Sequence, residues 1–211
     1  MDEETRISKS RLEALTDGIF AIVMTLLVLE IAVPQILSHE PDVVRAELPK
    51  RLFDLWPKIF SYVISFIILA IYWRGHHRQF HYIKHSDGVL VWTNIIFLMA
   101  VSFLPFSTSL LGEYIDQQIS VFIYGGNSIV IALLLYIQWR YATNHYRLVD
   151  KNLDPNIIRR LPRRVLIGIL AYLIAMVVSF VNIQSSVFLF TLIVIPAVLP
   201  NRIVYGVRQN Q

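Results

Sequence analysis

The sequence predicts an all-α integral membrane protein: a single domain over residues 1–211 with six membrane-spanning helices. The chain is 55% hydrophobic and only 16% charged, whereas soluble domains are about a quarter charged. Six stretches each supply the roughly 20 apolar residues that cross a bilayer. All 19 Lys and Arg side chains fall in or next to the connections between these stretches. Together these observations exclude an ordinary soluble globular domain.

The predicted spans are residues 12–33, 59–83, 88–111, 119–142, 164–182 and 186–205. The first contains an uncharged run from Gly18 to Leu29, and the third carries a lone amide at Asn94, which we expect to join helices by hydrogen bonding. Pro105 should bend the outer end of the third span, because proline breaks the helical hydrogen-bond pattern. Gly125 and Gly126 in the fourth span indicate close helix packing. The connection between the first two spans predicts a short interfacial helix near residues 43–56.

The basic residues predict the orientation of the chain. All but four lie on one side of the membrane, and the four on the other side are Arg45, Lys50, Arg51 and Lys58. Cytoplasmic connections carry the excess of Lys and Arg, so both termini are expected in the cytoplasm. The basic connection over residues 144–164 is expected to contact anionic lipid headgroups. The net charge of +4 reflects this topology and does not suggest nucleic-acid binding.

The first span carries a narrow stripe of side chains. At 100° per residue, Ile22, Leu26 and Leu29 lie within about 60° of one another, with Thr25 at the border. Such a stripe is typical of either a pore lining or a packing interface, and we interpret it as a pore lining. Asp17 points about 140° away from Ile22.

Asp17 and the end of the second span lie at the same membrane depth. The Trp73 indole and the His76 imidazole can donate hydrogen bonds to a carboxylate, so the three side chains predict a network that fixes the first helix. The alternative for Asp17 and His76 is a gating or proton-sensing role, since ionisable groups at membrane depth are costly unless paired or hydrated.

The sequence contains few residues that could support catalysis or metal binding. A stripe of His77, His81 and His85 could suggest a metal site, but no H-E-x-x-H pattern accompanies it. The stripe also begins where the second helix leaves the bilayer, which favours a solvated helix end. The chain has no cysteine and no nucleophile elbow, P-loop or paired membrane carboxylates. We therefore expect neither an enzyme nor a bound cofactor or metal.

The first half of the chain resembles the transmembrane-protein-175 family, which comprises lysosomal and prokaryotic potassium channels. The resemblance begins with Arg11 and Leu15-Thr16-Asp17, which are similar to an Arg-x-x-x-Phe-Ser-Asp signature with Leu for Phe and Thr for Ser. It continues through the following Gly-Ile-Phe-Ala-Ile run and through residues of the second and third spans: Trp73, His76, Phe80, Asp87, Asn94 and Phe103 to Phe106.

The resemblance implies a homotetramer in the prokaryotic cell membrane, with four copies of the first helix around a central pore. It implies that Ile22 forms the narrowest constriction, that Thr25 forms a polar selectivity layer, and that Leu26 and Leu29 form further apolar rings. Arg11, Asp17, Trp73 and His76 correspond to a stabilising network. K⁺ is then the permeant ion, and selectivity is modest because the pore wall is an intact helix.

Two alternatives remain open from the sequence. The channel could conduct protons or respond to pH through His76 and Asp17. A secondary cation transporter is the other alternative, although such proteins usually contain internal repeats and broken helices that this sequence does not show.

Overall fold

The computed structural model describes residues 8–37 and 39–198, and these form helices joined by short connections. In chain order the helices are α1 (Lys9–Leu29), α2 (Pro41–Asp54), α3 (Trp56–Tyr82), α4 (Gly88–Ser102), α5 (Leu104–Glu113), α6 (Gln118–Thr143), the 3₁₀ turn η2 (Asn144–Tyr146), α7 (Pro155–Val178) and α8 (Ile183–Val198). The all-α architecture predicted from the sequence is confirmed.

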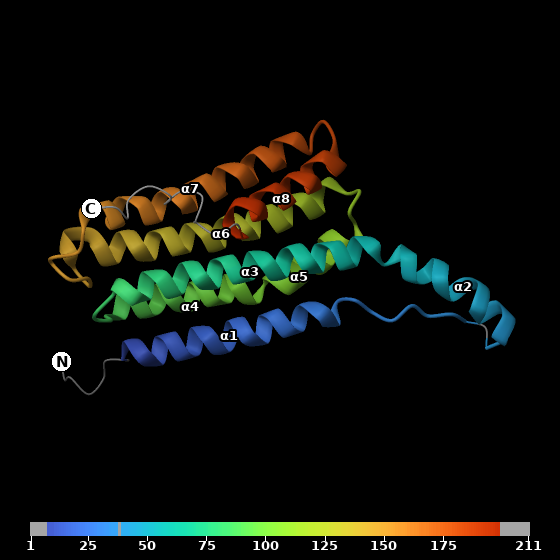
Figure 1. Ribbon diagram of the computed structural model, residues 1–211, viewed down its shortest axis with the longest axis horizontal. Coiled ribbons are helices and arrows are strands. Elements are labelled where there is room, and N and C mark those ends of the chain that lie inside the picture. Colours follow the sequence, from blue (N-terminus) through green and yellow to red (C-terminus); the bar gives the residue numbers. More distant parts are fainter. Residues whose placement is uncertain (1–7, 38, 199–211) are drawn as a thin grey trace, which may run out of the picture.

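The helices other than α2 form an elongated bundle (Figure 1). The first helix, α1, lies along one edge and packs on α3, α4 and α5, while α6, α7 and α8 form the opposite part. A continuous apolar core joins the two parts through α3 and α6, and its members include Phe20, Leu69, Phe97, Tyr124, Ile131 and Phe190. The first helix is thus bound to the subunit along one side only.

Within the described residues, five stretches are helical, long and apolar enough to cross a membrane: α1, α3, the α4–α5 pair, α6 and α7. The sixth predicted span corresponds to α8, which is also apolar but shorter. Residues 199–205 of that prediction lie outside the described residues.

The third predicted span is divided into two helices. The residue between them, Phe103, keeps helical dihedral angles (φ −81°, ψ −12°). Pro105 stands in the first turn of α5, where its missing N–H costs nothing. The expected bend is therefore a helix break just before the proline.

Several helix boundaries differ from the sequence prediction, and three of the differences change the connections. The first helix ends at Leu29 and not at residue 33, and the chain then leads through Pro34 toward α2. The predicted interfacial helix is present as α2, but it begins at Pro41, projects away from the bundle and has no buried residue (Figure 1). The fifth span begins at Pro155, well before the predicted residue 164.

The early start of α7 has a local cause. The side chain of Asp154 accepts a hydrogen bond from the Asn156 N–H at 2.8 Å, and Pro155 occupies the first helical position. An acidic cap followed by proline is a typical helix start. Four arginines therefore lie on the first turns of α7 and not in the connection that the sequence predicts: Arg159, Arg160, Arg163 and Arg164.

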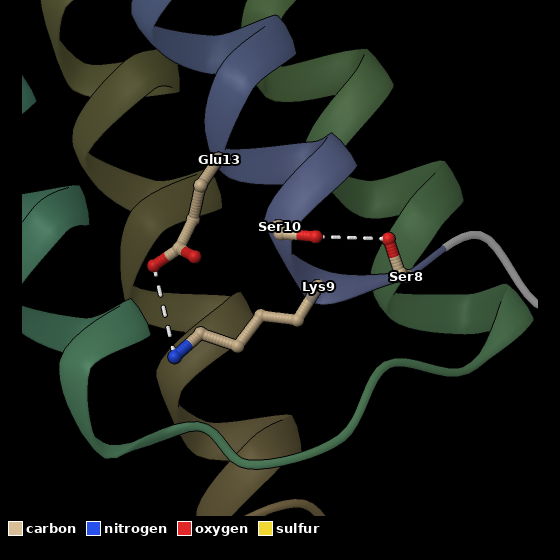
Figure 2. A network of polar contacts seen from close by, with 4 residues as sticks. All are labelled: Ser8, Lys9, Ser10 and Glu13. Atoms are coloured by element: carbon tan, nitrogen blue, oxygen red, sulfur yellow. Dashed lines mark hydrogen bonds and ion pairs between the residues drawn. The ribbon is translucent and has the colours of Figure 1, made fainter.

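The starts of α1, α4 and α7 and the ends of α3 and α6 gather at one end of the bundle, which we call the basic end (Figure 1). At this end α1 begins with a surface ion pair, Lys9 Nζ to Glu13 Oε1 at 3.7 Å, and a Ser8–Ser10 hydroxyl contact of 3.0 Å (Figure 2). Ion pairs at the protein surface contribute little stability. The position of α1 must therefore be set by its packing further along the helix.

At the opposite end, α5 approaches α3 closely at Gly112. A Cβ atom at Gly112 would lie 2.6 Å from the Ser61 Oγ and 3.0 Å from the Lys58 Cα. The same approach brings the Lys58 ammonium within 2.5 Å of the Glu113 carboxylate. A side chain at position 112 would therefore force the Ser61 side chain or the Lys58 backbone to shift.

Gly112→Ala should lower the free energy of unfolding by about 1–3 kcal/mol, because the added methyl group overpacks a backbone contact. Thermal unfolding of the purified protein in detergent measures this change. Gly126→Ala is the matched control, since its Cβ would meet no atom within 4 Å. The control should be neutral or stabilising by about 0.5–1 kcal/mol, and equal losses in both variants would contradict the packing argument.

Candidate pore-lining helix

The first helix has one buried face. Its buried residues recur at helical spacing and face α3, α4 and α5: Leu12, Thr16, Phe20, Val23 and Leu27. Phe20 packs against Phe97 of α4, with the ring centroids 6.0 Å apart. This face holds α1 on the subunit and fixes its rotation about its own axis.

The predicted stripe lies outside the buried face, on the exposed side of the helix. Ile22, Leu26 and Leu29 are 55%, 41% and 72% exposed. Leu15 continues this face toward the basic end and is also exposed. An apolar face that points away from its own subunit can contact only lipid, another copy of the chain or a pore.

Thr25 lies on the same exposed face. Its hydroxyl donates a hydrogen bond to the Ile22 carbonyl oxygen one turn earlier, at 2.7 Å. The hydroxyl proton is thereby engaged, so the oxygen lone pairs are the part of the group that remains for a partner outside the helix. Such an oxygen suits a cation.

Asp17 lies at the flank of the exposed face, and it contacts α3. The Trp73 Nε1–H donates to Asp17 Oδ1 at 2.8 Å, and the Trp73 ring stacks on His77 with centroids 5.8 Å apart. This contact joins Asp17 and Trp73 as the sequence analysis expected. Both residues are exposed in the isolated subunit.

The second expected donor, His76, has a different partner. It is buried, its ring stacks between Phe80 and Phe97, and its Nε2 lies 2.9 Å from the Asn94 Oδ1. The Asn94 Nδ2 in turn donates to the Thr16 hydroxyl at 3.1 Å. Since the amide nitrogen faces Thr16, the amide oxygen accepts from the His76 Nε2–H. This hydrogen-bond chain, Thr16–Asn94–His76, connects α1, α4 and α3.

Arg11 is not part of either contact. No hydrogen bond or ion pair joins its guanidinium to another side chain in the described part of the protein. The side chain is exposed, and at 100° per residue its direction lies about 20° from that of Ile22. The sequence analysis expected Arg11 to form a network with Asp17, Trp73 and His76, and within this subunit Arg11 does not contact them. The rotation of α1 directs Arg11 toward the exposed face instead.

Thr16 is the site residue that sequence reasoning missed, since it was noted only as a replacement for serine. Its spacing from the apolar residues Leu12 and Phe20 could have placed it on the buried face. Among residues 8–37 and 39–198, no group of three or more His, Cys, Asp or Glu side chains is arranged to hold a metal ion. His77 stacks on Trp73, and His81 lies edge-on to Tyr82.

Comparison with known proteins places these features in a family. A family model described as the endosomal/lysosomal potassium channel TMEM175 matches residues 11–105, which include most of α1 and the hydrogen-bond chain. A potassium channel of Chamaesiphon minutus is 34% identical over 84% of this chain and 87% of its own length. A potassium channel of Streptomyces collinus is 31% identical over 82% of each chain.

A solved structure shares the fold. The crystal structure of a lysosomal potassium-selective channel TMEM175 homolog from Chamaesiphon minutus matches with a TM-score of 0.77 and 31% identity, covering 90% of this chain and 95% of that one. The endosomal/lysosomal proton channel TMEM175 of chicken is 27% identical over 88% of this chain, but this chain spans only 37% of its length.

Asn94→Leu should destabilise the protein by about 1–3 kcal/mol, because it leaves the buried His76 and Thr16 groups without their partner. Thermal unfolding in detergent measures the change. Asn127→Leu is the matched control: Asn127 is also in a span, but it is half-buried and its bond to the Ser107 hydroxyl is longer, 3.3 Å. If Asn94→Leu were as stable as the wild type, the stabilising role of the Thr16–Asn94–His76 hydrogen bonds would be contradicted.

Proposed function

The chain belongs to the TMEM175 family of channels, and from this premise we propose that it is a potassium-selective cation channel that conducts K⁺ passively through a pore lined by α1. It is a multi-pass membrane protein of a channel family and not an enzyme. Its similarity to named potassium channels over most of both chains supports the choice of ion. The channel is proposed to be a homotetramer.

The observation that carries the proposal is the exposed face of α1. Only one side of α1 is attached to the subunit, and the free side presents Ile22, Leu26 and Leu29 with the Thr25 hydroxyl among them. If four copies of this helix surrounded a central axis, the sides of neighbouring copies would contact one another. The free faces would then line an ion pathway along the axis. The likeness to a solved potassium-selective channel homolog supports an oligomeric channel.

A pore wall of this kind acts through side chains. The carbonyls of an intact helix are engaged in hydrogen bonds four residues along the chain, so they cannot replace the hydration shell of an ion. A ring of four Ile22 side chains would gate the path by making a thin water column unfavourable. Four Thr25 oxygens would offer partial replacement of water. Selectivity for K⁺ over Na⁺ should accordingly be modest.

The proposed orientation places the basic end of the bundle in the cytoplasm of a prokaryotic cell, together with both termini. The excess of Lys and Arg at that end supports it. The arginines at the start of α7 would then meet the anionic inner surface of the plasma membrane.

Proton conduction is the second candidate function, favoured by the names of the vertebrate relatives. His76 offers it little support, because the side chain is buried between phenylalanine rings and bonded to Asn94, away from the exposed face of α1. A secondary transporter is disfavoured by the family assignment. Potassium conduction therefore remains the leading proposal.

Ile22→Asn should increase K⁺ flux into proteoliposomes and weaken the preference for K⁺ over Na⁺, because a polar ring is wetted more readily. Flux is measured under matched K⁺ and Na⁺ gradients. The control is Ile174→Asn, because Ile174 is also exposed, 50% against 55% for Ile22, but lies on α7. Unchanged flux and selectivity in Ile22→Asn would remove Ile22 as the gate.

Thr25→Val should reduce the preference for K⁺ by about fivefold while K⁺ still passes, as expected for the loss of a polar interaction of about 1 kcal/mol. Reversal potentials in mixed K⁺ and Na⁺ solutions measure the preference. Thr25→Ser keeps the hydroxyl and should behave like wild type. A serine variant that discriminates as poorly as the valine variant would contradict the role of the hydroxyl.

A further inference from the structure

A shallow groove lies on the outward face of α6 at the basic end. Its lining in the described part of the chain is Tyr136, Ile137, Arg140, Tyr141 and Asn144, and its volume is about 350 Å³. These residues recur at helical spacing, and they are opposite the face of α6 that is buried in the bundle.

Arg140 is the central charge of the groove. It lies in the last turn of a spanning helix and is exposed, and among the described residues no carboxylate pairs with it. An arginine at this depth extends its guanidinium toward the membrane–water interface and is stabilised by an anion there. Within residues 8–37 and 39–198, no carboxylate forms an ion pair with Arg140 that could take the place of this anion.

A second guanidinium is held at the rim of the groove. Arg147 Nη1 donates to the Tyr141 hydroxyl at 2.9 Å, and its Cζ lies 4.7 Å from the centre of the Tyr141 ring. Tyr141 is fixed in turn, because its hydroxyl donates to Asp87 Oδ2 at 2.6 Å. The other oxygen of Asp87 accepts the Leu90 N–H at 2.9 Å and caps α4.

The backbone after α6 explains why Arg147 returns to this place. His145 and Tyr146 have positive φ angles of 51° and 55°, so the chain turns back on itself. The Leu148 N–H then bonds to the Ala142 carbonyl at 2.9 Å. Non-glycine residues rarely adopt this conformation, and two in succession are maintained only when surrounding contacts favour them. Here the turn sets Arg147 against Tyr141.

We propose that this groove binds the headgroup of an anionic phospholipid, with the phosphodiester between Arg140 and Arg147. Guanidinium groups form charge-assisted hydrogen bonds with phosphate oxygens, and Asn144 adds an amide donor at the outer end. Tyr136 and Ile137 lie deeper along α6 and provide the apolar contact that the glycerol and first acyl carbons need. The charge and the apolar surface are thus ordered along the helix as they are in a phospholipid.

The site differs from the basic start of α7. There the arginines are exposed and attract an anionic surface diffusely, which salt screens. In the groove the second arginine is positioned by a tyrosine and an aspartate. Only the assignment of the lipid to the inner leaflet rests on the proposed orientation of the channel.

The test counts lipid molecules retained by the purified full-length protein, by native mass spectrometry at high salt with phosphatidylglycerol or phosphatidylcholine as the probe. Wild type should retain phosphatidylglycerol preferentially. Arg140→Ala should reduce that retention by about tenfold, the loss typical of a charge-assisted hydrogen-bonded contact. Arg159→Ala removes the same charge from the exposed start of α7 and should leave retention unchanged.

Four outcomes would overturn the proposal. Equal losses in Arg140→Ala and Arg159→Ala would show diffuse attraction, and no loss in Arg140→Ala would show that the groove is not the site. Displacement of the lipid by an equal concentration of soluble glycerophosphate would show that the acyl chains contribute nothing to binding. The chain has no cysteine, so Ile137→Cys gives a single thiol, and disulfide-linked dimers of it would show that a second copy covers the groove. Flux measured on the same variants tests the channel proposal separately.

Discussion

The rotation of α1 about its axis depends on a hydrogen-bond chain buried beside an apolar face. Thr16, Asn94 and His76 bind one another across α1, α4 and α3, with donor–acceptor distances of 3.1 and 2.9 Å. Inside a membrane no water is present to form a hydrogen bond with an unpaired polar group, so each of the three side chains requires its partner. Rotating α1 would break the bond to Thr16 and expose the face that carries Phe20, Val23 and Leu27.

This constraint decides which residues α1 offers to its surroundings. With Thr16 and Phe20 facing inward, Ile22, Thr25, Leu26 and Leu29 must face outward, and so must Arg11. The Trp73–Asp17 contact of 2.8 Å supports the same rotation from the flank. An intact helix with its carbonyls engaged and a free face of apolar side chains is suited to a hydrophobic constriction. It is poorly suited to selection of ions by backbone oxygens.

Periodicity and chemistry predicted the parts of this account that are local. The stripe, the joining role of Asn94 and the Trp73–Asp17 contact followed from residue spacing and from donor and acceptor types. The partner of His76 and the exposed position of Arg11 did not follow, because both depend on how the helices pack. The break of the third span before Pro105 was expected as a bend. The early start of α7 was not expected, because the helix-start signal of Asp154 and Pro155 is followed by arginines that favoured a connection outside the membrane.

Accessibility along α1 tests the pore assignment most directly. Because the chain has no cysteine, Thr25→Cys and Leu29→Cys introduce single thiols on the free face, and Val23→Cys and Leu27→Cys introduce them on the buried face. Silver ions added to K⁺-conducting proteoliposomes bind thiolates that they can reach through water. The account predicts loss of K⁺ flux for the first pair and not for the second. Block at Val23 and Leu27, with none at Thr25 and Leu29, would contradict it.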